Sequence, residues 1–157
     1  MLKAQNVAPI RAEIDRLIDL KIPVVTVFTD CPDCARLAYV GLNNANAGRT
    51  AAYLFAQCLQ GRSGAVLTTT SRRQFQGEEA RAQAFAAEMA RLCPEVTLHE
   101  ASGGAGLALE TATRITRAVH GLDYLLGVYS MGGANAAILS TLVNAQLEPE
   151  FFIAHDL

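Results

Sequence analysis

The sequence has few charged residues, no block of one charge sign and no long apolar run, and each deficit excludes a class of protein. Of its 157 residues 18% are charged, and 13 Lys and Arg against 15 Asp and Glu give a formal net charge of −2. Without a run of Lys or Arg, the chain presents no electrostatic footprint for nucleic acid or an anionic membrane. No apolar stretch approaches the roughly 20 residues that span a bilayer, and the first residues, MLKAQNVAP, lack the apolar centre of a signal peptide. We therefore expect that this chain by itself contacts neither DNA nor a membrane.

Cysteine and histidine are scarce as well. The four cysteines, Cys31, Cys34, Cys58 and Cys93, are too few and too scattered for a disulfide scaffold, so a cytoplasmic location is the simpler expectation. The three histidines have no second histidine, cysteine or carboxylate pair at a recognisable metal-ligand spacing. We therefore expect no metal and no cofactor.

Cys31 and Cys34 nevertheless form a pattern with known chemistry. They flank two residues and follow a predicted strand, which is the setting of a dithiol redox pair. No aromatic residue directly precedes Cys31, and no second cysteine pair stands at zinc-finger spacing. We expect neither a disulfide nor a bound metal here, and redox chemistry is the minor alternative.

The stretch from Tyr39 to Thr70 has the pattern of a strand, a helix and a second strand. An apolar run at 39–42 meets Asn43, Asn44 and Asn46, whose side chains suit the free amides that open a helix. The glycines at 61 and 64 then end the helix before a buried-looking run at 65–68. Two strands joined through a packed helix lie parallel, and their carboxyl ends face the same side.

The same alternation of apolar patterns continues along the chain. Apolar spacing predicts helices at 9–20, 78–92, 107–119 and 132–145, and strands at 22–28, 39–42, 65–69, 95–100, 124–129 and 151–154. The last five strands, separated by four helices, predict an α/β fold, a doubly wound and mainly parallel sheet with helices on both faces. Such sheets bind ligands at the carboxyl ends of their strands.

Several short segments, in this order and spacing, resemble the sensor domain of LacI-type regulators and the periplasmic sugar-binding proteins that share its fold. The segments are Ile22–Thr26, Tyr39–Gly41, Asn44 with Ala47–Arg49, and Glu79–Arg81 running to Phe85. The resemblance implies two lobes. Residues 1–33 would be the last helix and strand of a truncated N-terminal lobe, and residues 34–157 would be the C-terminal lobe, with 30–37 crossing between them. The apolar strand at 22–28, without its usual neighbours, is expected to pack against a second copy or against the C-terminal sheet, which favours a homodimer.

The resemblance also implies candidate ligand-binding residues at the cleft. Arg81 matches an arginine that holds ligand hydroxyls in the family, and its planar fork of donors suits paired hydroxyls or a carboxylate. The alternative is an arginine on a solvated helix start. Asp156 matches an acidic residue that receives ligand hydroxyls. The full set of candidates is Asp30, Ser71, Arg73, Arg81, Ser130 and Asp156.

Ser130 has a second interpretation. The segment Ser130–Ala134, SMGGA, follows a strand as the nucleophile of a serine hydrolase does. That motif needs a small residue where Val128 stands, and only His155 and Asp156 follow, adjacent to one another. The plainer interpretation is a helix start capped by the Ser130 hydroxyl.

The sequence thus predicts a non-catalytic domain that senses a small, sugar-like effector in a LacI-type transcriptional regulator. DNA would be contacted only through an N-terminal domain that this chain lacks. A periplasmic solute-binding protein of a sugar transporter is the first alternative, and a serine hydrolase that uses Ser130 is the remote one.

Overall fold

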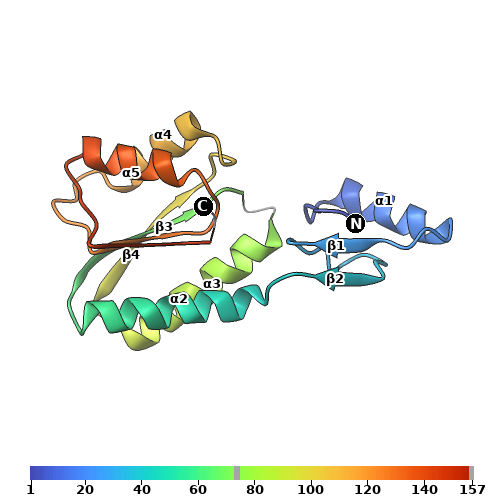
Figure 1. The fold of residues 1–157 in the computed structure, drawn as a ribbon, viewed down its shortest axis with the longest axis horizontal. Helices are drawn as coiled ribbons and strands as arrows, with labels where there is room; N and C mark the ends of the chain where they lie inside the picture. Colours follow the sequence, from blue (N-terminus) through green and yellow to red (C-terminus); the bar gives the residue numbers. More distant parts are fainter. Residues whose placement is uncertain (73–74, 156–157) are drawn as a thin grey trace.

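The computed structural model describes residues 1–72 and 75–155, which form two α/β units placed side by side (Figure 1). The elements in chain order are α1 Ala8–Asp19, β1 Val25–Val27, β2 Ala38–Val40, α2 Asn44–Leu59, β3 Gly64–Thr70, α3 Gln76–Leu92, β4 Val96–Ser102, α4 Ala108–Ala118, β5 Gly127–Ser130, α5 Asn135–Asn144 and β6 Phe151–Ala154. We call residues 1–42 the small unit and residues 43–155 the large unit. No described helix is long and apolar enough to cross a membrane.

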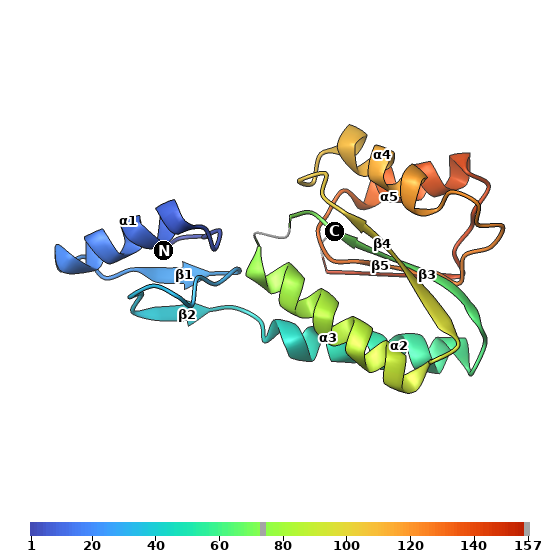
Figure 2. The same cartoon turned by 180° about the vertical axis from the view of Figure 1, so that it is seen from behind.

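The large unit is a four-stranded sheet in the order β4-β3-β5-β6, and all its strand pairs are parallel. Helices α2 and α3 cover one face and α4 and α5 cover the other (Figures 1 and 2). The alternation along β3 explains both layers, because Val66 packs toward α2 and α3 while Ala65 and Leu67 pack toward α4 and α5. The predicted α/β fold with a parallel sheet and helices on both faces is confirmed.

The small unit holds the other two strands. Strand β1 pairs in parallel with β2, in the register Val25 with Ala38 and Val27 with Val40. On its other side β1 bonds to Leu2, whose N–H donates to Val25 O and whose carbonyl accepts from the Val27 N–H, each at 2.9 Å. Helix α1 covers one face of this sheet through a core that includes Ala4, Ile14 and Val24.

This pairing corrects two of the expectations from sequence. The strand predicted at 39–42 does not join the large sheet; it pairs with β1, although residues 28–37 between the two strands contain no helix. Helix α2 therefore joins two sheets rather than two strands of one sheet. The strand predicted at 22–28 also has partners on both edges within its own unit, so it is not left unpaired for a second chain.

The packing of α2 against α3 sets the geometry of the large unit near the small one. A Cβ atom on Gly48 of α2 would overlap the carbonyl oxygen of Arg81 and press on the backbone of Phe85, both in α3. Only glycine permits this approach of the two helices. In the core next to this contact, the rings of Phe55 and Phe85 meet edge to face with centroids 5.5 Å apart. The centroid of the Tyr129 ring lies 4.5 Å from that of the Phe85 ring.

Candidate functional site

A cavity of about 550 Å³ lies between the small and the large unit. Its walls come from segments that follow strands β1, β2, β5 and β6, and from the start of α3. It therefore occupies the carboxyl ends of the parallel strands, where open α/β sheets bind ligands. The lining residues are Met1, Lys3, Val27, Phe28, Thr29, Val40, Gly41, Leu42, Phe75, Gly77, Glu78, Arg81, Met131 and His155.

Arg81 is the buried cation of this cavity. Its side chain is in the first turns of α3, and the residue is only 9% exposed. Its Nε and Nη2 both donate to Oδ1 of Asn44, at 3.1 and 2.9 Å, and Nη1 lies 3.5 Å from the carbonyl oxygen of Met131. No described carboxylate forms an ion pair with it. The alternative of a solvated arginine on a wet helix start is therefore wrong for Arg81.

Tyr129 and His155 meet at the end of the neighbouring strands. The Tyr129 hydroxyl lies 2.7 Å from Nε2 of His155, and their ring centroids are 5.6 Å apart. Tyr129 has no exposed surface, and this burial raises the pKa of its hydroxyl to about 12, although the nearby Arg81 charge acts in the opposite direction. A neutral hydroxyl is thus held against an imidazole on the cavity wall.

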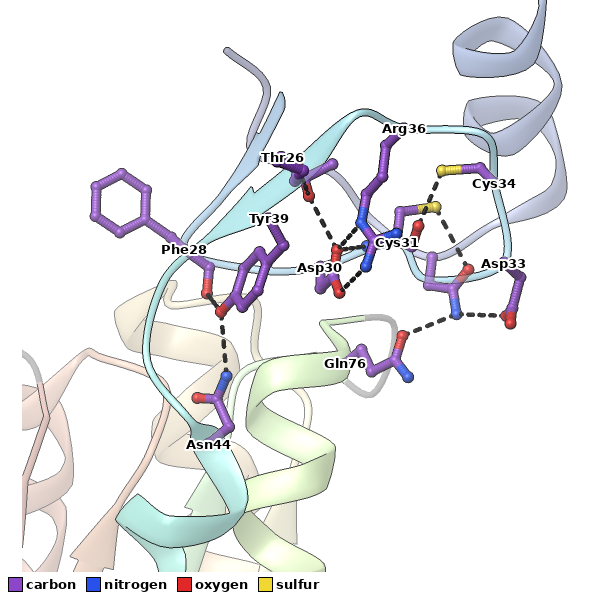
Figure 3. A network of polar contacts seen from close by, with 12 residues as sticks. Thr26, Phe28, Asp30, Cys31, Asp33, Cys34, Arg36, Tyr39, Asn44 and Gln76 are labelled. Atoms are coloured by element: carbon purple, nitrogen blue, oxygen red, sulfur yellow. Dashed lines mark hydrogen bonds and ion pairs between the residues drawn. The ribbon is translucent and has the colours of Figure 1, made fainter. Parts of the chain in front are cut away.

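The small unit contributes Phe28 and Thr29, which directly follow β1. Phe28 has a φ of 64°, which is rare for a bulky side chain, and its residue is 74% exposed. Its carbonyl lies 3.1 Å from the Tyr39 hydroxyl, and Asn44 Nδ2 donates to that hydroxyl at 3.5 Å (Figure 3). Thr29 is 4% exposed, and its hydroxyl has no partner among the described residues. Both residues line the cavity, Phe28 with an exposed side chain and Thr29 with a buried hydroxyl that has no partner among the described residues.

Two predicted site residues have partners inside the large unit and do not line this cavity. Ser71 donates its hydroxyl to Glu78 Oε1 and its N–H to Oε2, both at 2.6 Å. Ser130 is 1% exposed and donates to Oδ1 of Asn135 at 2.6 Å, so it does not cap the free amides of α5 as expected from the sequence. Within the described residues the Ser130 hydroxyl bonds Asn135 and not a histidine, whereas Nε2 of His155 lies beside the Tyr129 hydroxyl.

Asp30 belongs to the small unit, away from the cavity wall. Its carboxylate accepts two bonds from Arg36, each 2.6 Å, one from the Thr26 hydroxyl at 2.9 Å and one from the Cys31 N–H at 2.7 Å. Partial burial alone would raise the pKa of Asp30, but these hydrogen bonds and the Arg36 charge together hold it below its usual value. These hydrogen bonds engage the Asp30 carboxylate in holding the loop that follows β1. The candidates Arg73 and Asp156 lie outside the described residues.

Of the candidates named from the sequence, Arg81 lines this cavity, whereas Phe28, Thr29 and Tyr129 were not among those candidates. The position of Phe28 and Thr29 directly after a predicted strand was the available signal, because strand ends form the cleft. Nothing in the sequence places Tyr129 against His155, since their strands are joined only by the folded sheet. No group of three or more His, Cys, Asp and Glu in the described part of the chain is arranged to hold a metal ion.

Solved structures with this fold are numerous, and they are about twice as long as this chain. A glucose-galactose binding protein, GanP from Geobacillus stearothermophilus, is 21% identical with a TM-score of 0.84, over 98% of this chain and 55% of that one. The XylFII molecule is 16% identical with a TM-score of 0.81, over 98% and 57%. A putative LacI transcriptional regulator from Bacteroides fragilis is 19% identical with a TM-score of 0.76, over 96% and 53%.

The chain therefore spans a little over half the length of these structures. No protein of curated function matches it in sequence. A family model does match, and it extends from residue 1 to residue 157. The chain belongs to the family of the periplasmic binding protein domain.

Proposed function

We propose that the cavity between the two units binds a sugar-like small molecule and that the protein acts by binding rather than by catalysis. The observation that carries this proposal is the buried guanidinium of Arg81, which lines the cavity and is held by the neutral side chain of Asn44. Of its five N–H groups, the described residues occupy three, two at Asn44 and one at Met131. The planar fork of donors suits a pair of neighbouring hydroxyl groups.

The rest of the wall fits the same chemistry. The Phe28 ring offers an apolar face, the buried Thr29 hydroxyl has no partner among the described residues, and most other lining side chains are apolar. Small-molecule sites usually combine apolar walls with a few placed polar groups in this way. The similar structures, which include a glucose-galactose binding protein, make a sugar the first ligand to test.

The mechanism we propose is stabilisation of one arrangement of the two units. A ligand that contacts Phe28 and Thr29 on one side and Arg81 on the other interacts with both units only when they are close together. Its differential affinity for that arrangement shifts the equilibrium toward it. The two units correspond to the two lobes, and the sheet pairing favours a division after Leu42 rather than near residue 33.

We further propose that this domain serves a LacI-type regulator, with DNA bound through a domain outside this chain. The likeness to a putative LacI regulator supports it, and the likeness to transport binding proteins supports a solute-binding protein of a sugar transporter as the second candidate. A mobility-shift assay of the full gene product on its own promoter separates the two. A cytoplasmic location and a homodimer stay predictions.

Titration calorimetry of the 157-residue chain with D-glucose, D-galactose, D-fructose and D-xylose tests the binding site. We expect saturable binding of at least one sugar, and about 10-fold to 100-fold weaker binding in Arg81→Gln, because hydrogen bonds from a charged donor contribute roughly 1.5–3 kcal/mol. Arg91→Gln is the matched control, since Arg91 lies on the same helix and pairs with Glu88 at the surface. Equal affinity in both variants would refute the role of Arg81.

A further inference from the structure

The thiols of Cys31 and Cys34 lie together in a turn of the small unit. Pro32 and Asp33 form the turn, and the Cys34 thiol donates to the carbonyl oxygen of Cys31 at 2.9 Å (Figure 3). The ends of such a turn have Cα atoms less than about 7 Å apart, and a disulfide needs roughly 4.4–6.8 Å. The backbone therefore already brings the two cysteines within bonding range.

The loop that holds these thiols is fixed at both ends. Before Cys31, Asp30 is bound by the guanidinium of Arg36 through two bonds of 2.6 Å. After Cys34, the N–H of Ala35 donates to Asp15 of α1 at 2.7 Å. These contacts restrict the backbone of the turn, so the two sulfur atoms stay close together.

The two thiols differ in their exposure. Cys31 is fully buried, whereas Cys34 is half-buried and reachable from solvent. Burial raises the pKa of Cys31, the hydrogen bond and charge interaction with Cys34 raise it as well, and together these effects bring it to about 11. The second effect disappears once the Cys34 sulfur is covalently bound. This asymmetry assigns the first reaction to Cys34 and the second to Cys31.

We propose that Cys31 and Cys34 form a reversible disulfide by exchange with a low-molecular-weight disulfide such as oxidised glutathione. The Cys34 thiolate attacks one sulfur of the reagent, so that a mixed disulfide forms and one thiol leaves. The Cys31 thiolate then attacks the Cys34 sulfur, the internal disulfide forms, and the second thiol leaves. The cysteine pair loses two electrons and two protons, and the reagent gains them as two thiols.

Formation of this disulfide acts on a contact between the two units. The Cys31 thiol donates to Oδ1 of Asn6 at 3.6 Å, and Arg11 donates to the same oxygen at 2.9 Å. Asn6 Nδ2 in turn donates to Asp33 at 3.3 Å and to Gln76, the first residue of α3, at 3.0 Å (Figure 3). Oxidation removes the Cys31 bond from Asn6, so it weakens the anchor of the Asn6–Gln76 contact.

The test equilibrates the native chain with graded ratios of reduced and oxidised glutathione, quenches with acid and alkylates the free thiols before peptide mapping. We expect an internal Cys31–Cys34 disulfide that is lost again in excess reduced glutathione. In Cys31→Ser the mixed disulfide should accumulate on Cys34, whereas Cys34→Ser should give no modification in this loop. Cys58→Ser is the control, because Cys58 is exposed and reacts independently of the turn.

Two outcomes overturn the proposal. One is that Cys31 and Cys34 stay open to alkylation at every glutathione ratio in the wild-type chain. The other is that glutathione is found only on Cys58. For the coupling, hydrogen exchange at the amides of residues 76–80 is compared between the oxidised and the reduced chain. We expect faster exchange after oxidation, and equal rates would disprove the effect on the Asn6–Gln76 contact.

Discussion

Two nitrogens of the Arg81 guanidinium, Nε and Nη2, share a single acceptor, Oδ1 of Asn44. The pair joins α3 to the first residue of α2 and holds the buried cation beside the cavity. Because the acceptor is a neutral amide, this contact solvates the positive charge without cancelling it.

Removal of this acceptor should destabilise the large unit. In Asn44→Ala the buried guanidinium loses two hydrogen bonds, and we expect the free energy of unfolding in urea to fall by about 1.5–3 kcal/mol. Asn44→Asp is the control, because a carboxylate at the same place still accepts from Arg81 and is favoured at a helix N-terminus. An Asn44→Ala chain as stable as the wild type would contradict the structural role of this contact.

Gly48→Ala should disrupt the packing of α2 on α3. The added methyl group would overlap the Arg81 carbonyl, and overpacking of this kind costs about 1–3 kcal/mol. Thermal unfolding is the measurement, with the exposed Thr50→Ala on the same helix as the control. A Gly48→Ala chain that unfolds at the wild-type temperature would show that the two helices move apart without cost.

Tyr129→Phe should change the alkaline limb of the stability curve. The pKa of Tyr129 is about 12 in the folded chain against an ordinary value near 10, so the folded state keeps the proton longer than the unfolded state does. The resulting stability is fully present below about pH 10 and is lost as the pH rises toward about 12.

We therefore expect the unfolding free energy of the wild type to fall relative to that of Tyr129→Phe between about pH 9 and about pH 12. The size of this fall is set by the difference between the folded and the unfolded pKa of Tyr129. Tyr53→Phe, an exposed tyrosine on α2, is the control and should leave the pH profile unchanged. A difference that stays constant across this range would contradict the burial of the Tyr129 hydroxyl.

Phe28→Gly should separate stability from binding. Glycine relieves the left-handed backbone at this position, and the exposed ring loses little packing, so we expect a gain of up to about 1 kcal/mol in unfolding free energy. Sugar binding should weaken, because the apolar face on the cavity is gone. Phe28→Ala keeps the strained φ and should lose binding without the gain; equal stability of the two variants would argue against strain at Phe28.

The sequence predicts the helices well because their signals are local. Asn43 caps α2 as expected, and its Oδ1 accepts from the Asn46 N–H at 2.9 Å. The partner of β2 is not a local property. The rule that parallel strands need a helical connection assigns Ala38–Val40 to the strand after α2, but the chain pairs it with the preceding one.

The candidate site shows the same limit. The type of residue at Arg81 indicates ligand chemistry, but its burial depends on Asn44, which is 37 positions earlier in the chain. Ser130 and Asp30 also have the residue types of a binding site. Their hydrogen bonds to Asn135 and Arg36, which only the folded chain forms, occupy them before any ligand is present.

The close approach at Gly48 has a consequence for selectivity. Because backbone meets backbone there, the position of Arg81 is preorganised, and a ligand gains its donors without the entropy loss of ordering a long side chain. In the binding site proposed above, such a fixed donor suits any molecule with two suitably spaced oxygens. We therefore predict that Phe28 and Thr29 of the small unit decide between such molecules, so substitutions after β1 should exchange one ligand for another while the helices that carry Arg81 stay unchanged.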